Sequence, residues 1–141
     1  VLQNHPAFEL YCFCIPEAMR KICHSGVSVH HCTHGDVLFK KGELPEHGHM
    51  FMLIHGKLKY ERESSDKHYV EQGQWVSEMV LWANWVHCGN LRVETDCSLL
   101  ALSADKVQKI GDSDLDIEAD IRPAAYAKWF VSKMNELQVH E

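Results

Sequence analysis

Glycines that recur at short intervals between Val27 and Leu102 constrain the fold of this chain more than any other feature. They stand at positions 35, 42, 48, 56, 73 and 89, and the segments between them are rich in strand-forming residues. Short strands separated by turn residues are typical of antiparallel sandwiches and rolls, not of parallel sheets. Leu58 and Tyr60 also alternate with charged residues, which is the period of a half-buried strand. The sequence therefore predicts a mainly β domain, an antiparallel jelly-roll-like β-roll of the double-stranded β-helix type.

A helical signal precedes the predicted roll. Pro16 is followed by an acidic residue and, near Cys23, by cations, which is the charge order that a helix dipole favours. Gly26 is a suitable residue to end this helix. We therefore expect an N-terminal helical segment before the first strand.

Two more helices are predicted after the roll. Ser103 is a candidate cap for a helix over 104–110 that ends at Gly111, and an acidic linker over 112–120 follows. A last helix over 123–137 has an apolar face, as expected for a helix that packs on a core. This face consists of Ala125, Tyr126, Trp129, Phe130, Met134 and Leu137.

Length and charge limit the class of protein. The 141 residues, 45% hydrophobic and 24% charged, suit one domain with a helical segment over 1–26, a roll over 27–102 and helices over 103–141. A formal charge of −6 and the lack of a basic stripe argue against nucleic acid as a partner. Apolar runs such as 50–54 are too short to insert into a membrane. Because the chain begins with Val1, we expect it to be a fragment of a longer protein.

Cysteine spacing and missing motifs argue against a disulfide scaffold and against catalysis. The six cysteines stand at positions 12, 14, 23, 32, 88 and 97, with no Cys-x-x-Cys pair, which favours reduced thiols and an intracellular setting. The chain has no nucleotide loop followed by Lys-Ser/Thr and no nucleophile elbow. We predict that it has no catalytic residues and is not an enzyme.

Two histidine-rich segments raise a metal-binding alternative. On one strand, His30, Cys32 and His34 would project to the same side and could meet a zinc ion, although no fourth ligand is specified. His47 and His49 form a His-x-His sequence similar to that of cupin metal enzymes, but no carboxylate follows within the next few residues. The sequence therefore predicts no bound metal, with a cupin-like enzyme as the less favoured alternative.

The segment 73–91 carries the most informative motif. It contains Ser77-Glu78, then an aliphatic run, and a histidine, His87, nine positions after the glutamate. This segment resembles the phosphate-binding cassette of cyclic-nucleotide-binding domains, in which a Gly-Glu pair opens a short helix and an arginine falls nine positions after the glutamate. Serine stands here at the position of that glycine, and histidine at the position of that arginine.

Other segments carry the same resemblance. Residues 35–43 are similar to the opening turn and strand of the family, residues 50–58 to its glycine-containing strand and hairpin, and residues 96–102 to the strand before its closing helices. The match runs from about Phe8 to Val107 and implies the fold already predicted from the glycines.

The resemblance implies a site for cyclic AMP or cyclic GMP. In the family, backbone N–H groups and the arginine bind the phosphate, and the glutamate accepts a hydrogen bond from the ribose. The Cβ of Ser77 obstructs a close backbone approach, and a histidine with a pKa of ~6.5 is mostly neutral at pH 7. We therefore expect an altered cassette that binds cyclic nucleotides weakly or not at all, and no other cofactor. Its residues are Ser77, Glu78, Met79, His87 and Cys88.

The tryptophan-rich cassette without arginine is most similar to the homology domains at the cytosolic C-terminus of voltage-gated cation channels of the ether-à-go-go group. That resemblance implies a regulatory domain on the cytoplasmic side of a membrane. Its partner would be the rest of the channel polypeptide, with a tetramer formed through that parent. The last helix would be a lid that packs on the roll through Tyr126, Trp129 and Phe130. The alternative is a functional cyclic-nucleotide sensor of a kinase-regulatory or other signalling protein.

Overall fold

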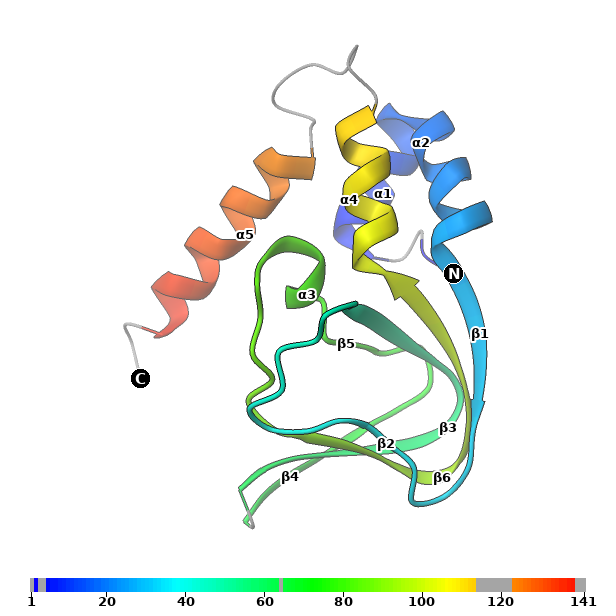
Figure 1. Ribbon diagram of the computed structural model, residues 1–141, viewed down its shortest axis with the longest axis vertical. Coiled ribbons are helices and arrows are strands. Elements are labelled where there is room, and N and C mark those ends of the chain that lie inside the picture. Colours follow the sequence, from blue (N-terminus) through cyan, green and yellow to red (C-terminus); the bar gives the residue numbers. More distant parts are fainter. Residues whose placement is uncertain (1, 3–4, 64, 114–122, 139–141) are drawn as a thin grey trace.

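The computed structural model describes residues 2, 5–63, 65–113 and 123–138, and it shows a curved sheet beneath a layer of helices (Figure 1). The elements in chain order are α1 (Pro6–Cys14), α2 (Pro16–Lys21), the π-helical turn η2 (Ile22–Gly26), β1 (Val27–Cys32), β2 (Val37–Phe39), β3 (His49–Glu63), β4 (Asp66–Val70), β5 (Trp75–Val76), α3 (Met79–Trp82), β6 (Asn90–Ser103), α4 (Ala104–Ser113) and α5 (Pro123–Gln138).

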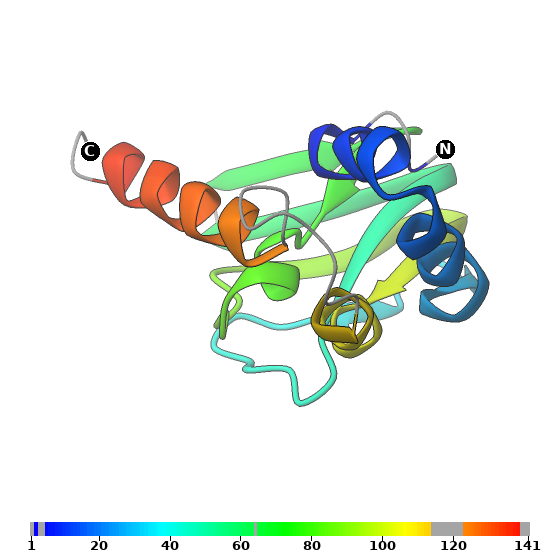
Figure 2. The same cartoon turned by 90° about the horizontal axis from the view of Figure 1, so that it is seen from above.

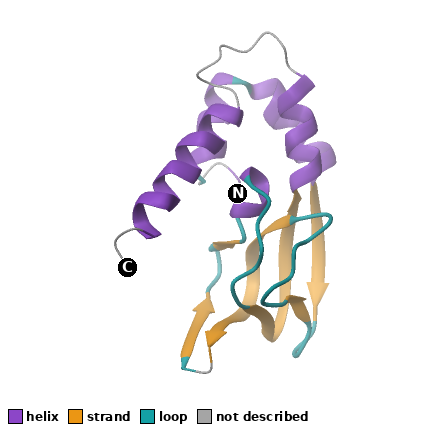
Figure 3. Ribbon diagram, turned by 60° about the vertical axis from the view of Figure 1, so that its left-hand side comes forward, coloured by secondary structure: helices purple, strands orange, loops and turns teal. Residues whose placement is uncertain are grey.

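The sheet is antiparallel and unclosed. Its strand order is β1-β6-β3-β4, with β2 paired to β6 and β5 paired to β3. The long strands β3 and β6 pair with each other along most of their length and curve the sheet into a roll. In Figure 3 the strands lie at one end of the molecule and the helices at the other. The predicted β-roll with flanking helices is confirmed.

Gly56 lies inside a strand, whereas the sequence pattern predicted a boundary between strands there. Its φ is +97°, and a Cβ added to it would come within 2.6 Å of the backbone oxygen of Asp96 and of the Cβ of Cys97. The pairing of β3 with β6 shifts register around this glycine. A bulge at a residue without a side chain therefore lets β3 bend and continue from His49 to Glu63.

The helices differ from the expected ones at two places. The helix α1 precedes α2 and was not predicted as a separate element; its N-cap residue, His5, makes no capping hydrogen bond that a sequence pattern could reveal. At the other end, α4 continues through Gly111 to Ser113, because a glycine inside a helix costs only about 1 kcal/mol relative to alanine. The acidic linker predicted over 112–120 lies largely outside the described residues.

Two apolar clusters fill the structure. The helical core joins α1, α2 and α4 to the start of β3 and the end of β6. It includes Phe8, Tyr11, Met50, Leu81, Leu102 and Val107. The roll core fills the inside of the sheet and includes Phe39, Leu53, Leu58, Leu91, Val93 and Leu99. Because each buried aliphatic or aromatic side chain contributes roughly 1.5–3 kcal/mol, these clusters supply most of the stabilisation. The cassette runs from one cluster to the other.

The helix α5 is the least integrated element of the described chain. Seen from above, it projects from the body of the molecule beside α3 (Figure 2). Trp129, on its predicted docking face, is 55% exposed. The expectation that Tyr126, Trp129 and Phe130 all pack on the body is therefore corrected, since one of the three faces solvent for most of its surface.

Candidate functional site: the cassette and its two ends

The cassette enters its short helix through a strained residue. After β5 the chain turns at Ser77, whose φ of +68° lies in the left-handed region, and α3 begins two residues later. A residue with a Cβ costs roughly 1–2 kcal/mol in that conformation, which glycine adopts freely. Within the described residues, the Oγ of Ser77 is also buried without a hydrogen-bond partner. Serine at this position therefore strains the backbone in addition to adding bulk.

Glu78 is held by side chains from three parts of the chain. Its Oε1 accepts hydrogen bonds from the indole Nε1 of Trp82 at 3.0 Å and from the hydroxyl of Tyr126 at 3.2 Å. Its Oε2 lies 3.1 Å from the Nε2 of His5. The histidine is only 3% exposed and packs edge-on against Trp75, with ring centroids 4.9 Å apart. Both carboxylate oxygens thus have partners within the protein.

These contacts keep the carboxylate charged. Burial raises the pKa of Glu78, but the hydrogen bond and charge of His5, with the hydrogen bonds from Trp82 and Tyr126, outweigh it and leave the pKa lowered. The pKa of Tyr126 is raised, first by burial and then by the negative charge of Glu78. At neutral pH the glutamate therefore accepts and the tyrosine donates.

The other end of the cassette is anchored by packing. The ring of His87 is 5% exposed and stacks on Phe39, with ring centroids 3.7 Å apart and planes 8° apart. Its backbone N–H donates to the oxygen of Glu43 at 2.9 Å, and its oxygen accepts from the N–H of Gly42 at 2.7 Å. Burial lowers the pKa of His87, against the opposing charge of Glu43. A neutral ring in the roll core cannot replace the forked cation of the family.

The remaining predicted site residues lie beside these two ends. Met79 is half-buried at the start of α3, next to Glu78. Cys88 is exposed beyond His87, where its thiol donates to a backbone oxygen. The structure thus separates the five residues into a group near the helices and a group near the roll. Sequence reasoning missed His5 as a partner of the site, since no local pattern joins residues so far apart.

The lid helix reaches the cassette mainly through Tyr126. Its ring lies 4.9 Å from the ring of Trp82, centroid to centroid, and stacks on Phe130 at 6.1 Å. Trp129 contacts Tyr126 at 5.5 Å but is otherwise exposed. The contact between α5 and the cassette therefore centres on one aromatic residue and its hydrogen bond.

The histidine-rich segments do not have the arrangement that the metal-binding alternative requires. His34 falls after the end of β1, so it does not share a strand face with His30 and Cys32, and its Nδ1 bonds the backbone oxygen of Glu94 at 2.6 Å. His47 pairs with a carboxylate of α4, and the described residues contain no group of three or more potential metal ligands.

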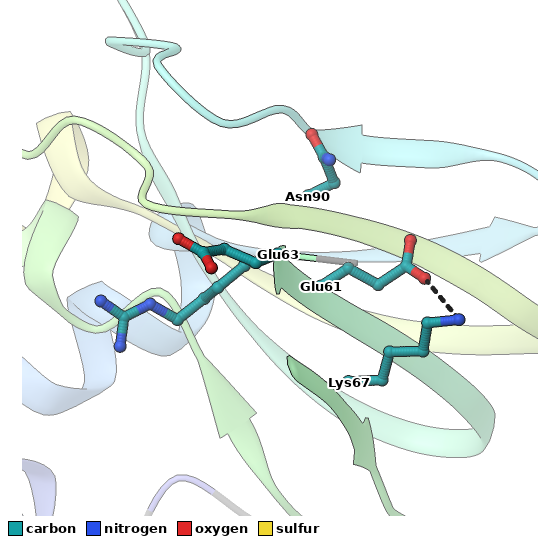
Figure 4. Close-up of a pocket in the computed structure, with 5 residues that line it drawn as sticks. Glu61, Glu63, Lys67 and Asn90 are labelled. Carbon is teal, nitrogen blue, oxygen red and sulfur yellow. Dashed lines mark ion pairs between the residues drawn. The ribbon is translucent and has the colours of Figure 1, made fainter. Parts of the chain in front are cut away.

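A separate cavity of about 390 Å³ opens at the end of the β3–β4 hairpin, away from the helices (Figure 4). Its lining consists of Glu61, Arg62, Glu63, Lys67 and Asn90. Glu61 and Lys67 point toward each other, with Oε1 and Nζ 3.8 Å apart. Two acids and two bases leave the lining without a net charge that would select an ion.

The cyclic nucleotide-binding domain family matches residues 29–114, and the chain belongs to that family. The fold is similar to the sensor domain of the transcriptional regulator DNR from Pseudomonas aeruginosa, with a TM-score of 0.69, 15% identity, and coverage of 99% of this chain and 84% of that one. It is also similar to the C-linker/CNBHD of zELK channels, crystallized in the presence of cAMP, with a TM-score of 0.68, 16% identity, and coverage of 96% and 62%.

A second structure of the same channel fragment has a TM-score of 0.63 and 14% identity, and it matches over 77% of this chain. The chain spans 59% of the length of that fragment. A comparison with curated protein sequences gives no significant match. Among the described helices, none combines the length and the apolar character needed to cross a membrane.

Proposed function

We propose that this chain is a regulatory domain of a larger signalling protein. In this domain, side chains of the protein itself bind the glutamate of the cyclic-nucleotide cassette. In this proposal cyclic AMP and cyclic GMP bind weakly or not at all. The observation that carries it is that both carboxylate oxygens of Glu78 already have partners within the protein, Trp82 and Tyr126 on Oε1 and His5 on Oε2. The role is regulatory and not enzymatic, as is typical of the family.

Two energetic penalties oppose the binding of a cyclic nucleotide. A ribose hydroxyl competes with three internal donors for Glu78, and displacing a buried donor so that it is left unpaired costs about 1–3 kcal/mol. At the phosphate end, the loss of the charge-assisted contact between arginine and phosphate costs a further amount of about 1.5–3 kcal/mol. Together these losses weaken binding by roughly a hundredfold to ten-thousandfold relative to an intact cassette.

The contacts of Glu78 also suggest how the domain would act. His5 lies next to the start of α1, and Tyr126 belongs to α5, so one carboxylate joins helices from both ends of the described chain. A movement of α5 would therefore change the contacts of Glu78, including its contact with His5 beside the N-terminal helices. We propose that the parent is a voltage-gated cation channel with this domain on the cytoplasmic side of the membrane, as a tetramer through the parent. The zELK similarity supports this parent.

Calorimetric titration with cyclic AMP and cyclic GMP tests the proposal. The unmodified chain should show a Kd weaker than about 1 mM, and micromolar binding would contradict the proposal. The double variant Ser77→Gly with His87→Arg restores the flexible backbone and the cation, and should improve affinity by roughly 2–4 kcal/mol. Tyr126→Phe, which frees one acceptor of Glu78, is the companion variant. The sequence that precedes Val1 tests the channel parent, which requires six apolar spans with an arginine-rich fourth.

A further inference from the structure

Two cysteines face each other across the sheet. In the antiparallel pairing of β1 with β6, Cys32 is directly opposite Cys97, and both thiols are free. Opposite residues of an antiparallel pair have Cα atoms about 4.5 or 5.5 Å apart and side chains on the same face. Both separations fall within the roughly 4.4–6.8 Å that a disulfide bridges. The backbone therefore already has the spacing of a cross-strand disulfide.

The surroundings of the two thiols differ. Cys97 is 5% exposed and belongs to the roll core, whereas Cys32 is partly exposed at the end of its strand. Each thiol contributes to the pKa shift of the other, which agrees with the closeness that the strand pairing gives them. An oxidant from solvent would therefore meet Cys32 first, with Cys97 positioned to resolve the product.

We propose that Cys32 and Cys97 form a reversible disulfide that staples β1 to β6. A hydroperoxide would oxidise the Cys32 thiol to a sulfenic acid and leave as the alcohol, or as water from hydrogen peroxide. The sulfur of Cys97 would then attack the sulfenic sulfur, forming the S–S bond, while the hydroxyl group leaves as water with the proton of Cys97. A dithiol reductant would reverse the bond by thiol–disulfide exchange.

The disulfide between Cys32 and Cys97 would constrain the part of the chain that contains the whole cassette. The covalent loop from Cys32 to Cys97 encloses β2 to β5 and α3, and it joins the strand that leaves the N-terminal helices to the strand that enters α4. Closing a loop of this length restricts the unfolded chain and raises the midpoint of thermal unfolding by roughly 5–10 °C. The oxidised domain would thus be a more rigid form of the same fold.

The thiols of Cys32 and Cys97 should react slowly near neutral pH. Burial and the charge of Asp36 raise the pKa of Cys32, and burial first of all raises the pKa of Cys97 to about 11. Since the thiolate is the nucleophile, disulfide formation should be slow near neutral pH and should become faster from about pH 7 to about pH 9.

The test uses hydrogen peroxide on a variant in which the other four cysteines, at positions 12, 14, 23 and 88, are serine. The expected result is the loss of two hydrogens in the intact mass, a non-reduced peptide that links Cys32 to Cys97, and a raised unfolding midpoint that dithiothreitol reverses. The same variant with Cys32→Ser is the control and should show none of these. A folded variant that stays reduced in excess peroxide would overturn the proposal.

The unmodified chain provides a second measurement that needs no folded variant. Cys12 contributes to the raised pKa of Cys23, so we take these two thiols as a competing pair. Peptide mapping of the oxidised chain should find the Cys32–Cys97 bond. A map that contains only a Cys12–Cys23 bond would contradict the proposal.

Discussion

The two ends of the cassette are attached to the protein by different physical means. At one end Glu78 is held by directional hydrogen bonds to Trp82, to Tyr126 and to His5. At the other end the ring of His87 is stacked on Phe39 in the roll core. Hydrogen bonds contribute about 1 kcal/mol each and can break singly, whereas a packed aromatic stack is lost only with the surrounding structure. The contacts at the Glu78 end should therefore break more readily than the packing at the His87 end.

The largest effect is expected from removing the packing at the His87 end. Phe39→Ala should reduce the free energy of unfolding by about 3–5 kcal/mol, because Phe39 is 6% exposed and supports the stacked ring. Val37→Ala, at an exposed position on the same strand, is the control and should cost less than about 1 kcal/mol. Urea denaturation measures both. Equal losses in the two variants would show that the stack is not an anchor.

Removal of the carboxylate at the other end should have the next largest effect. Glu78→Ala leaves the donors of Trp82, Tyr126 and the buried His5 without their acceptor, and should cost about 2–4 kcal/mol in the free energy of unfolding. Glu71→Ala removes an exposed carboxylate paired with Lys57, and should cost less than about 1 kcal/mol. If Glu78→Ala were as mild as this control, Glu78 would not join the helices.

A stabilising substitution is expected next to Glu78. Ser77→Gly should raise the free energy of unfolding by about 1–2 kcal/mol, because it relieves the left-handed backbone and removes a buried hydroxyl without a partner. Ser28→Gly, on an exposed strand position, is the control and should destabilise slightly. Thermal unfolding distinguishes the two signs, and a destabilised Ser77→Gly would contradict the account of this turn.

The smallest effect is a pH dependence at the His87 end. Because burial lowers the pKa of His87 below its ordinary 6.5, the unfolded state binds the proton more readily than the folded state. The stabilising contribution is therefore complete above pH 6.5 and is lost as the pH falls through the lowered pKa. In His87→Phe, which keeps a ring against Phe39, this part of the pH dependence should disappear. A slope unchanged from that of the unmodified chain would assign the effect to another group.

Local patterns predicted the roll but not the site. The glycines and the alternating strands depend only on neighbouring residues, so they indicate an antiparallel roll from sequence alone. Even so, the pattern predicts a strand boundary at Gly56, where the structure has a bulge, because a bulge and a turn require the same backbone freedom. The resemblance of the cassette located Glu78 and His87 in the sequence. Neither the burial of His87 nor its stack on Phe39 follows from a local pattern.

The partners of Glu78 depend on tertiary structure. His5 is far from Glu78 in the sequence, although the two side chains are in contact. Tyr126 belongs to a helix that sequence periodicity identifies only as apolar on one face. From the serine at a glycine position, the sequence predicts only that the Cβ of Ser77 obstructs a close backbone approach. The φ of +68° at Ser77 is visible only in the structure.

The most direct test of the central claim is the pKa of Glu78, measured by NMR titration of its side-chain carboxyl carbon. If the three internal donors hold the carboxylate, the pKa lies below the ordinary value of 4.5. The stability that Glu78 contributes is then complete above pH 4.5 and lost as the pH falls through the lowered value. The pKa should rise in the double variant His5→Ala with Tyr126→Phe. A pKa at or above 4.5 in the unmodified chain would contradict the account.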